Sequence, residues 1–285
     1  MIVVTGATGQ LGRLVVEQLL KAVPAKEIVA AVRTPSKAAD LAAKGVTVRE
    51  GDYAKPETLL TAFAGAEKVL LVSSNELFSD RVVQHKAAVD AAKAAGVKLL
   101  VYTSVLRADT SGLGLAAAHR ATEEYIKASG LPYVFLRNGW YMENHTEALG
   151  PALEHGAILG ASKDGRIAGA MRRDYAAAAV KVLTEASAVK PVYELAGDAP
   201  YTVADIAAEV SRQSGKPVVY NDMPVAEYEK ALQQFGLPVP LAKLLADSDA
   251  GVARGELDDS GHELSRLLGR PTESLATAVQ EALKG

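Results

Sequence analysis

The chain has 285 residues and a net charge of −3; 49% of its residues are apolar, 5% are aromatic and none is cysteine. This length fits one large domain or two unequal ones with a full apolar core. The lack of cysteine excludes disulfides, thiolate metal sites and cysteine nucleophiles, and the charge gives no general reason to bind nucleic acid. No secretion signal precedes the first predicted strand, and no apolar run approaches the ~20 residues of a membrane span. We therefore expect a cytoplasmic protein with no metal, no nucleic-acid partner and no membrane span.

The first half of the chain alternates apolar, β-rich runs with helical patterns. The predicted strands are 2–5, 28–32, 47–49, 69–72, 99–103 and 133–136, and the predicted helices are 11–22, 37–44, 58–63, 81–95 and 117–129. Gly45, Gly65, Gly96 and Gly130 each follow a predicted helix, as glycines that end helices do. Strands that are apolar throughout are typical of a parallel sheet covered on both faces. The predicted fold class is therefore α/β, a doubly wound Rossmann sheet that binds ligands at the carboxyl ends of its strands.

The rhythm changes after about residue 140. Helical patterns at 175–185, 203–214, 226–235 and 274–283 mix with short strands at 192–195 and 218–220. We interpret residues 1–140 as a Rossmann domain that binds NADP. Residues 141–285 are predicted to form a smaller, mostly helical substrate lobe that is integrated with the first domain and returns to the sheet.

Three glycines at three-residue spacing follow the first predicted strand, namely Gly6, Gly9 and Gly12. An amphipathic helical pattern comes directly after them. A strand, a tight turn and a helix in this order aim backbone N–H groups and the helix dipole at one point, where a pyrophosphate can bind. A glycine-rich turn without a ligand is the alternative, but the two flanking elements favour a dinucleotide site.

The residue after the second predicted strand indicates which dinucleotide is bound. An acidic residue there accepts a hydrogen bond from the 2′-hydroxyl of NAD, whereas an arginine favours the 2′-phosphate of NADP. This chain has Arg33, 21 positions after Gly12, and the next acidic residue is Asp40. The sequence therefore predicts NADPH in preference to NADH, with a solvated arginine as the alternative.

Polar residues also end three of the other predicted strands. Asp52 and Tyr53 follow the third strand and are expected to flank the adenine, unless they form a plain β-turn. Small hydroxyl residues end the fourth and fifth strands and are expected to border the ribose and nicotinamide: Ser73, Ser74, Thr103 and Ser104. Capping of the following helices is the alternative for these four.

The segment 137–144 has an unusual composition, because it holds the chain's only tryptophan together with amide and hydroxyl groups. It follows an apolar strand and should emerge beside the nicotinamide, where aromatic rings could stack on a planar ligand. The alternative is that Trp140 and Tyr141 anchor the second lobe. We expect His85 to be a partly exposed helix residue, with a catalytic role as the alternative. We expect His119 and Glu123 to form a surface ion pair, with a weak acid–base couple as the alternative.

Five features together resemble the NmrA-like atypical short-chain dehydrogenases. They are the Thr5–Gly12 fingerprint, Arg33, Gly51-Asp52-Tyr53, Tyr102-Thr103-Ser104 and Arg137-Asn138-Gly139-Trp140-Tyr141. Within that family the bacterial type 2 NAD(P)H:quinone oxidoreductases are the nearer match, and triphenylmethane dye reductases are close relatives. The resemblance implies that NADPH is bound through the residues Gly6, Ala7, Thr8, Gly9, Gln10, Leu11, Arg33, Ser73, Ser74, Asn75, Asn138, Gly139, Trp140, Tyr141, Glu143 and Asn144.

The chain lacks the Tyr-x-x-x-Lys pair with which ordinary short-chain dehydrogenases deliver a proton, since none of its ten tyrosines has a lysine four residues later. Reduction of a ketone produces a strongly basic alkoxide, so a positioned acid contributes about 10²–10⁴ in rate. Reduction of a quinone produces a phenolate with a pKa of about 10, which water or Tyr141 could protonate. The absence therefore favours an acceptor that needs orientation more than acid catalysis.

We expect an NADPH-dependent reductase that transfers a hydride directly from nicotinamide C4 to a quinone, without a flavin. Tyr141 is the candidate catalytic residue, a small-molecule quinone is the expected partner, and a homodimer is a further possibility. Two alternatives stay open: a redox sensor that binds NADP(H) without turnover, and a reductase of triphenylmethane or azo dyes.

Overall fold

Seven parallel strands form the central sheet of this protein, which we describe from a computed structural model. The structure describes residues 1–76, 78–147, 149–185 and 190–284. The chain divides into two compact units. Unit 1 comprises Met1–Asp109, Ala117–Asn138 and Arg172–Leu195, and unit 2 comprises Thr110–Ala116, Gly139–Met171 and Ala196–Gly285.

The sheet of unit 1 has the strand order β3-β2-β1-β4-β5-β6-β8, and every pairing is parallel. Its strands are β1 (Ile2–Thr5), β2 (Ile28–Val32), β3 (Thr47–Glu50), β4 (Lys68–Leu71), β5 (Leu99–Val105), β6 (Tyr133–Asn138) and β8 (Val192–Leu195). The chain runs outward from β1 to β3 and then returns past β1 to β4. This reversal creates the switch point at which doubly wound sheets bind their ligands.

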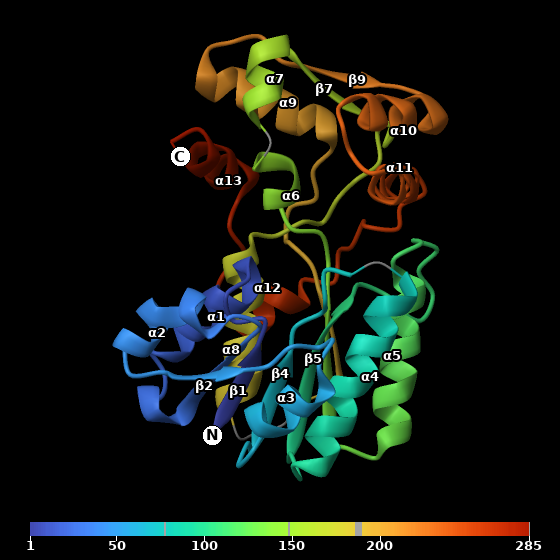
Figure 1. Cartoon of the computed structure of the whole chain (residues 1–285). Coiled ribbons are helices and arrows are strands. Elements are labelled where there is room, and N and C mark those ends of the chain that lie inside the picture. The colour runs from blue at the N-terminus through green and yellow to red at the C-terminus, as the bar shows by residue number, and fades with distance from the viewer. Residues whose placement is uncertain (77, 148, 186–189, 285) are drawn as a thin grey trace. The chain divides into compact units, whose positions relative to one another are not determined.

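Helices cover both faces of the sheet, as the uniformly apolar strands predict. The helices of unit 1 are α1 (Gln10–Leu19), α2 (Ala39–Ala43), α3 (Pro56–Ala62), α4 (Phe78–Ala94), α5 (Ala116–Ser129) and α8 (Arg172–Thr184), with 3₁₀ turns η1 (Ala25–Glu27) and η2 (Pro35–Ala38). In Figure 1, α1 and α8 lie on one side of β4 and β5, and α4 and α5 lie on the other. The predicted doubly wound Rossmann sheet is confirmed.

The main core of unit 1 lies beneath α3, α4 and α5. Fully buried side chains from four strands meet there, including Val29, Leu71, Tyr102 and Phe135, and they pack against residues such as Phe63, which directly follows α3. The four helix-ending glycines all have positive φ, between 67° and 86°. They end their helices as predicted and turn the chain back toward the sheet.

Unit 2 is mostly helical. Its elements are α6 (Glu143–Thr146), α7 (Leu149–His155), β7 (Ala157–Gly160), α9 (Val203–Ser214), β9 (Val219–Asp222), α10 (Val225–Gln234), α11 (Val239–Ala253), α12 (Glu263–Leu268) and α13 (Leu275–Ala282). The strands β7 and β9 pair in parallel as a separate two-stranded sheet. The predicted smaller, mostly helical C-terminal lobe is confirmed as part of the fold class.

Several elements differ from the prediction, and two of the differences have identifiable reasons. The strand predicted at 133–136 continues to Asn138. The charged Arg137 does not end the strand, because it pairs with Glu123 on a helix that packs against the sheet. The helix α11, whose first residue is flanked by Pro238 and Pro240, was not predicted. Those prolines lie at the N-cap and in the first turn of α11, where a missing N–H costs nothing.

Candidate functional site

The glycine turn joins β1 to α1, and each of its glycines has a separate structural reason. Gly6 has a φ of +58° and its carbonyl accepts a hydrogen bond from Gly9 N at 2.8 Å. A Cβ on Gly12 would lie 2.3 Å from the Gly6 carbonyl oxygen, so any side chain there would break the turn. A Cβ on Gly9 would meet only that same oxygen, at 3.2 Å. Gly9 is exposed, so a larger residue there would obstruct a ligand more than it would disturb the fold.

The turn offers a ligand backbone groups more than side chains. Ala7 is fully buried and Leu11 is 8% exposed, so both side chains belong to the core. The helix α1 begins at Gln10, and its first turn holds no acidic residue. The first N–H groups of a helix have no intrahelical partner and, with the helix dipole, favour an anion. Of the predicted residues in this turn, Gly9 and Gln10 are exposed, and Gly6 and Thr8 are half-buried.

Arg33 directly follows β2 and is exposed. Among the described residues, its guanidinium makes no hydrogen bond or ion pair. The next acidic residue, Asp40, is already engaged by Arg13, whose Nη1 lies 2.5 Å from the carboxylate. The carboxyl end of β2 therefore presents a cation that is available to a phosphate, and no carboxylate in the described part of the chain pairs with it.

Asp52 and Tyr53 make hydrogen bonds within the protein close to the glycine turn. The Asp52 carboxylate accepts a hydrogen bond from Ala54 N at 3.0 Å, so it closes a local turn. The Tyr53 hydroxyl lies 2.5 Å from Thr5 Oγ1 and donates to Val72 O at 2.6 Å. Tyr53 thus joins the carboxyl ends of β1 and β4 beneath the glycine turn. Burial raises the pKa of its phenol, which stays neutral.

The hydroxyl residues at the ends of β4 and β5 diverge in the structure. Ser73 N donates to Thr103 Oγ1 at 2.9 Å, which brings these two predicted residues together. Ser104 points to the other face of the sheet and donates to Glu123 Oε1 at 2.6 Å. Asn75 is exposed in the loop after β4. Ser104 is 5% exposed and bonded to Glu123, so its side chain is part of the buried packing between β5 and α5.

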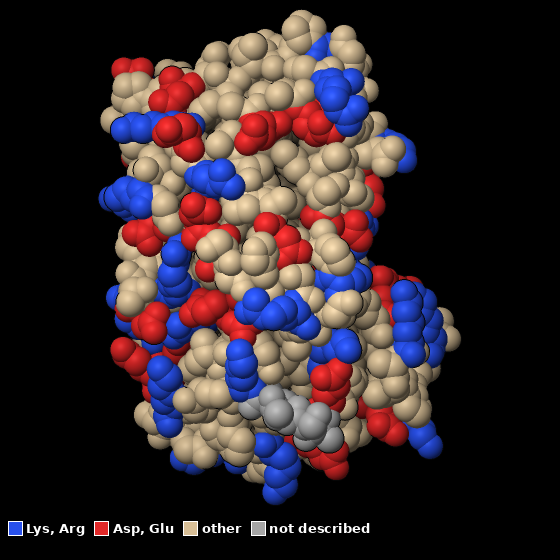
Figure 2. All heavy atoms as spheres, turned by 180° about the vertical axis from the view of Figure 1, so that it is seen from behind, with Lys and Arg blue, Asp and Glu red and all other residues tan. Residues whose placement is uncertain are grey.

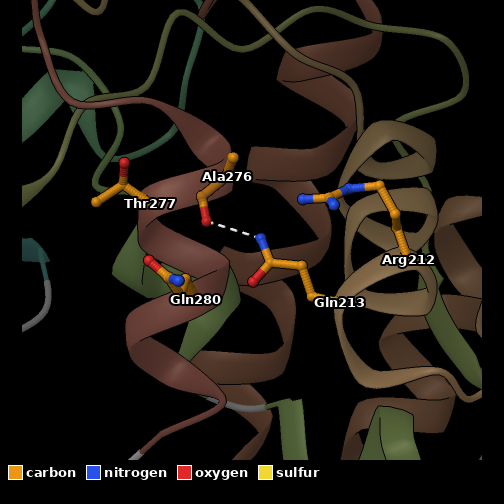
Figure 3. Close-up of a pocket in the computed structure, with 5 residues that line it drawn as sticks. All are labelled: Arg212, Gln213, Ala276, Thr277 and Gln280. Carbon is orange, nitrogen blue, oxygen red and sulfur yellow. Dashed lines mark hydrogen bonds between the residues drawn. The ribbon is translucent and has the colours of Figure 1, made fainter.

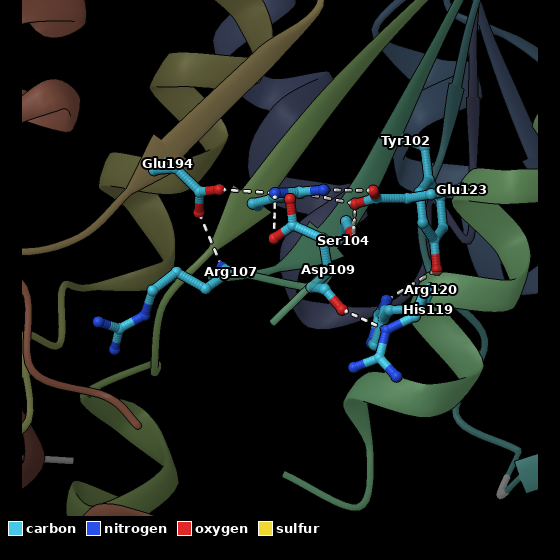
Figure 4. Close-up of polar contacts among 10 residues, drawn as sticks. Tyr102, Ser104, Arg107, Asp109, His119, Arg120, Glu123 and Glu194 are labelled. Carbon is cyan, nitrogen blue, oxygen red and sulfur yellow. Dashed lines mark hydrogen bonds and ion pairs between the residues drawn. The ribbon is translucent and has the colours of Figure 1, made fainter. Parts of the chain in front are cut away.

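A buried ion pair that the sequence did not reveal lies behind these strand ends (Figure 4). Arg137 of β6 contacts Glu123 of α5 with both Nε, at 2.9 Å, and Nη2, at 2.7 Å. The Arg137 side chain is 5% exposed and that of Glu123 is 2% exposed. Arg137 Nη1 also reaches Glu194 at 2.8 Å and Asp109 at 3.0 Å. Burial opposes the charged form, but the hydrogen bonds that Arg137 donates to Glu123 and Glu194 raise its pKa.

Two expectations for histidines are wrong. His119 and Glu123 do not form a surface ion pair: His119 is 6% exposed and its Nδ1 lies 2.8 Å from the Tyr102 hydroxyl, while Glu123 pairs with Arg137. His85 is fully buried, not partly exposed. Spacing along one helix could not show which neighbouring strand would cover these residues. Burial of His119 among Tyr102, His85 and the Arg81 cation lowers its pKa well below the usual value.

The segment that follows β6 leaves unit 1 at Asn138 and enters unit 2 at Gly139. Asn138 is 3% exposed, and its carbonyl accepts a hydrogen bond from Leu106 N at 2.9 Å. Within unit 2, Trp140 O accepts from Ala170 N at 3.1 Å, and an isolated bridge pairs Tyr141 with Ala170. This pairing anchors the segment to its own unit. The helix α6 then begins with Glu143 and Asn144, of which Asn144 is exposed.

A shallow depression on unit 2 lies between α9 and α13 and has a volume of about 410 Å³. Its lining residues, shown in Figure 3, are Arg212, Gln213, Ala276, Thr277 and Gln280. Arg212 is bonded to Glu209, and Gln213 Nε2 donates to Ala276 O at 2.8 Å. The side chains of Arg212 and Gln213 are thus already engaged in hydrogen bonds with residues of the same unit.

The remaining surface features are plain. On the face shown in Figure 2, lysine and arginine side chains are interspersed with aspartate and glutamate. Within the described residues, no cluster of three or more histidine, aspartate or glutamate side chains is placed to hold a metal ion. None of the described helices is long and apolar enough to cross a membrane.

Comparisons with known proteins agree with this arrangement. The model of the NmrA-like family matches residues 1–259. The chain is 52% identical to quinone oxidoreductase 2 of Escherichia coli over 98% of its length and 97% of that protein. A crystal structure of the NADPH-dependent quinone oxidoreductase of Escherichia coli complexed with NADPH is similar with a TM-score of 0.96, at 51% identity over 99% of this chain and 100% of that one. Triphenylmethane reductase of Citrobacter sp. complexed with NADP(H) gives a TM-score of 0.94, at 39% identity over 99% of this chain and 100% of that one. The chain therefore belongs to the NmrA-like family.

Proposed function

We propose that this protein is an NADPH-dependent quinone reductase that transfers two electrons as a hydride. The observation that carries the proposal is the pairing of a glycine turn that suits a pyrophosphate with an available cation, Arg33, at the neighbouring strand end. The 52% identity to a quinone oxidoreductase over nearly the whole chain supports the choice of acceptor.

The residues of unit 1 fit NADPH. The backbone N–H groups around Gly9 and Gln10 would hold the pyrophosphate, and Arg33 would pair with the 2′-phosphate. An arginine and a phosphate form charge-assisted hydrogen bonds with two-point geometry. The loop after β4 and the end of β5 would border the nicotinamide half, through Ser73, Asn75 and Thr103. When bound, NADPH supplies a hydride from nicotinamide C4.

The residues of the chain would bind and orient the acceptor more than activate it. A quinone that accepts a hydride and a proton becomes a hydroquinone, whose phenolic oxygen has a pKa of about 10. No tyrosine of the chain has a lysine four residues later, so the usual acid of short-chain dehydrogenases is absent. Tyr141 is the proposed proton donor, with water as the other source. Trp140 and Tyr141 offer flat rings on which a planar acceptor could stack.

A dye reductase is the second candidate, because the similarity to a triphenylmethane reductase also extends over nearly the whole chain. A cationic triphenylmethane dye accepts a hydride at its central carbon without a proton, so it too would need no acid. A redox sensor that binds NADP(H) without turnover shares the whole cofactor site and differs only in lacking an acceptor reaction.

Steady-state NADPH oxidation separates these candidates. We expect rapid turnover with benzoquinone or menadione and a lower kcat/KM with malachite green or an azo dye, measured at equal enzyme concentrations. Faster decolourisation of the dye would overturn the proposed acceptor. NADPH binding without turnover on any of these acceptors would favour the sensor.

A further inference from the structure

The loop after β4 is tied to α4 by a set of buried and half-buried contacts that the proposed function does not use. Ser74 N donates to His85 Nε2 at 2.9 Å, and Ser74 Oγ donates to Gln84 Oε1 at 2.5 Å. Ser74 Oγ also accepts from Glu76 N at 3.1 Å, and Arg81 Nε donates to Glu76 O at 2.8 Å. Ser74 is 8% exposed and faces the helix, whereas its neighbour Asn75 is exposed.

The partners of His85 define its protonation state. A backbone N–H can only donate to a ring nitrogen that carries no hydrogen, so Nε2 must be the unprotonated atom. Nδ1 then carries the hydrogen and donates to Thr122 Oγ1 at 2.9 Å, while the Thr122 hydroxyl donates to Ala118 O. Each polar atom of the imidazole is therefore used by a fixed partner. Burial and the Arg81 cation lower the pKa of His85 to about 3, which keeps it neutral.

The groups around this imidazole come from several elements. Arg81 is on the same helix, Tyr102 of β5 places its hydroxyl 3.4 Å from His85 Nδ1, and Tyr53 packs edge-on with ring centroids 6.3 Å apart. His119 of α5 lies beyond Tyr102. Among the described residues that contact His85, no carboxylate hydrogen-bonds to it. Its environment therefore favours a neutral hydrogen-bond acceptor at Nε2.

We propose that His85 is a positioning residue for the nicotinamide half of the cofactor site, because it fixes Ser74 and thereby the direction in which Ser73 and Asn75 face. This inference rests on the proposed NADPH site. In doubly wound sheets each half of the dinucleotide is bound by one half of the sheet. The strands β1–β3 hold the glycine turn and Arg33, so β4 and its loop belong to the other half. His85 therefore acts on the nicotinamide half of the ligand indirectly, through the loop backbone at Ser74 that it holds in place.

A pair of variants separates the two hydrogen bonds of the ring. In His85→Gln, the amide oxygen reaches about as far as Nε2 and can accept from Ser74 N. In His85→Asn, the shorter amide reaches only as far as Nδ1, so it can bond Thr122 but not Ser74. Both variants replace the ring with an amide, and both lose ring packing. They differ chiefly in the contact to the loop.

The probes are NADPH and adenosine 2′,5′-bisphosphate, which carries the adenosine half and the 2′-phosphate without the nicotinamide. We expect His85→Asn to raise the Kd for NADPH about tenfold, the effect of one lost hydrogen bond. The Kd for adenosine 2′,5′-bisphosphate should stay within about twofold. His85→Gln should bind both ligands within about threefold of the wild-type protein.

Two results would overturn the inference. One is equal NADPH affinity in the Asn and Gln variants, and the other is a parallel loss of both ligands, which would indicate general disruption of the fold. If His85→Asn does not fold, the half-buried Gln84→Met removes the second tie to Ser74 and should weaken NADPH about threefold and leave adenosine 2′,5′-bisphosphate unchanged. No effect of Gln84→Met on NADPH would contradict the inference. Failure of the proposed function shows separately, as wild-type protein that binds NADPH but reduces no quinone.

Discussion

The two halves of the sheet in unit 1 differ in the groups found at the carboxyl ends of their strands. The half formed by β1, β2 and β3 presents backbone N–H groups at a glycine turn and the exposed Arg33, which has no hydrogen-bond or ion-pair partner among the described residues. The half formed by β4, β5 and β6 depends on side chains buried behind the strand ends, namely His85, Glu123 and Arg137. We propose that the first half binds the ligand through groups that it exposes, and that the second half depends on how its loops are positioned. Substitutions should therefore affect the first half through ligand binding and the second through stability and loop position.

The largest effect on the first half is expected for Gly9→Val. A branched side chain at this exposed turn would occupy the space in which the pyrophosphate approaches the backbone, while the nearest protein atom to a new Cβ is the Gly6 oxygen at 3.2 Å. Binding of both NADPH and NADH should be abolished, as measured by titration of nucleotide fluorescence. The unfolding midpoint should change little. Intact affinity would place the pyrophosphate elsewhere, and Gly12→Ala, with a Cβ at 2.3 Å from the same oxygen, should by contrast lower the stability.

The largest effect on the second half is expected for Glu123→Gln. Removal of one partner from a buried ion pair costs about 3–5 kcal/mol because the other charge stays buried. Of its described ion-pair partners, Arg137 would retain Glu194 and the outer Asp109. Urea unfolding should show this loss. Asp109→Asn is the matched control, because the Asp109 side chain is 62% exposed and an exposed pair contributes about 0–1 kcal/mol. Equal effects of the two substitutions would contradict the assignment of Glu123 as the buried partner.

Arg33→Asp should change the cofactor preference without changing stability. Hydrogen bonds to a charged group contribute about 1.5–3 kcal/mol, so the Kd for NADPH should rise about 10- to 100-fold. The Kd for NADH should stay within about twofold, because NADH has no 2′-phosphate. Equal losses for the two cofactors, measured side by side, would remove Arg33 from the 2′-phosphate site.

The smallest expected effect is a pH dependence of stability that is due to His85. Its pKa is about 3 in the folded protein, lowered by burial and by Arg81, and about 6.5 when unfolded. The unfolded state therefore binds more protons between these values, so this contribution is complete above pH 6.5 and is lost as the pH falls toward 3. From pH 7 to pH 5 the loss is about 2 kcal/mol.

The variant His85→Gln should flatten the dependence of the unfolding free energy on pH by that amount. His155→Gln is the control, because His155 lies exposed at the end of α7. An unchanged slope in His85→Gln would mean that the imidazole is already protonated or solvated in the folded protein.

The same contrast explains what the sequence could and could not predict. The Rossmann sheet, the glycine turn and the position of Arg33 follow from local patterns, because an apolar strand, a turn and an amphipathic helix are adjacent in the chain. The contacts of Ser74 with His85, and of Arg137 with Glu123, join residues 11 and 14 positions apart whose meeting depends on how helices pack on the sheet. The spacing of apolar residues along the sequence does not show how the helices pack on the sheet. The ligand contacts of the predicted residues in both units, Tyr141 included, stay predictions, as does the homodimer.

The most direct test of the proposed activity is anaerobic single-turnover reduction of menadione with NADPH and with NADPH deuterated at the transferred position of C4. Direct hydride transfer predicts one NADPH oxidised per quinone reduced, without added flavin, and a slower reaction with the deuterated cofactor. Two quinones reduced by one electron each per NADPH, or a dependence on added flavin, would contradict it.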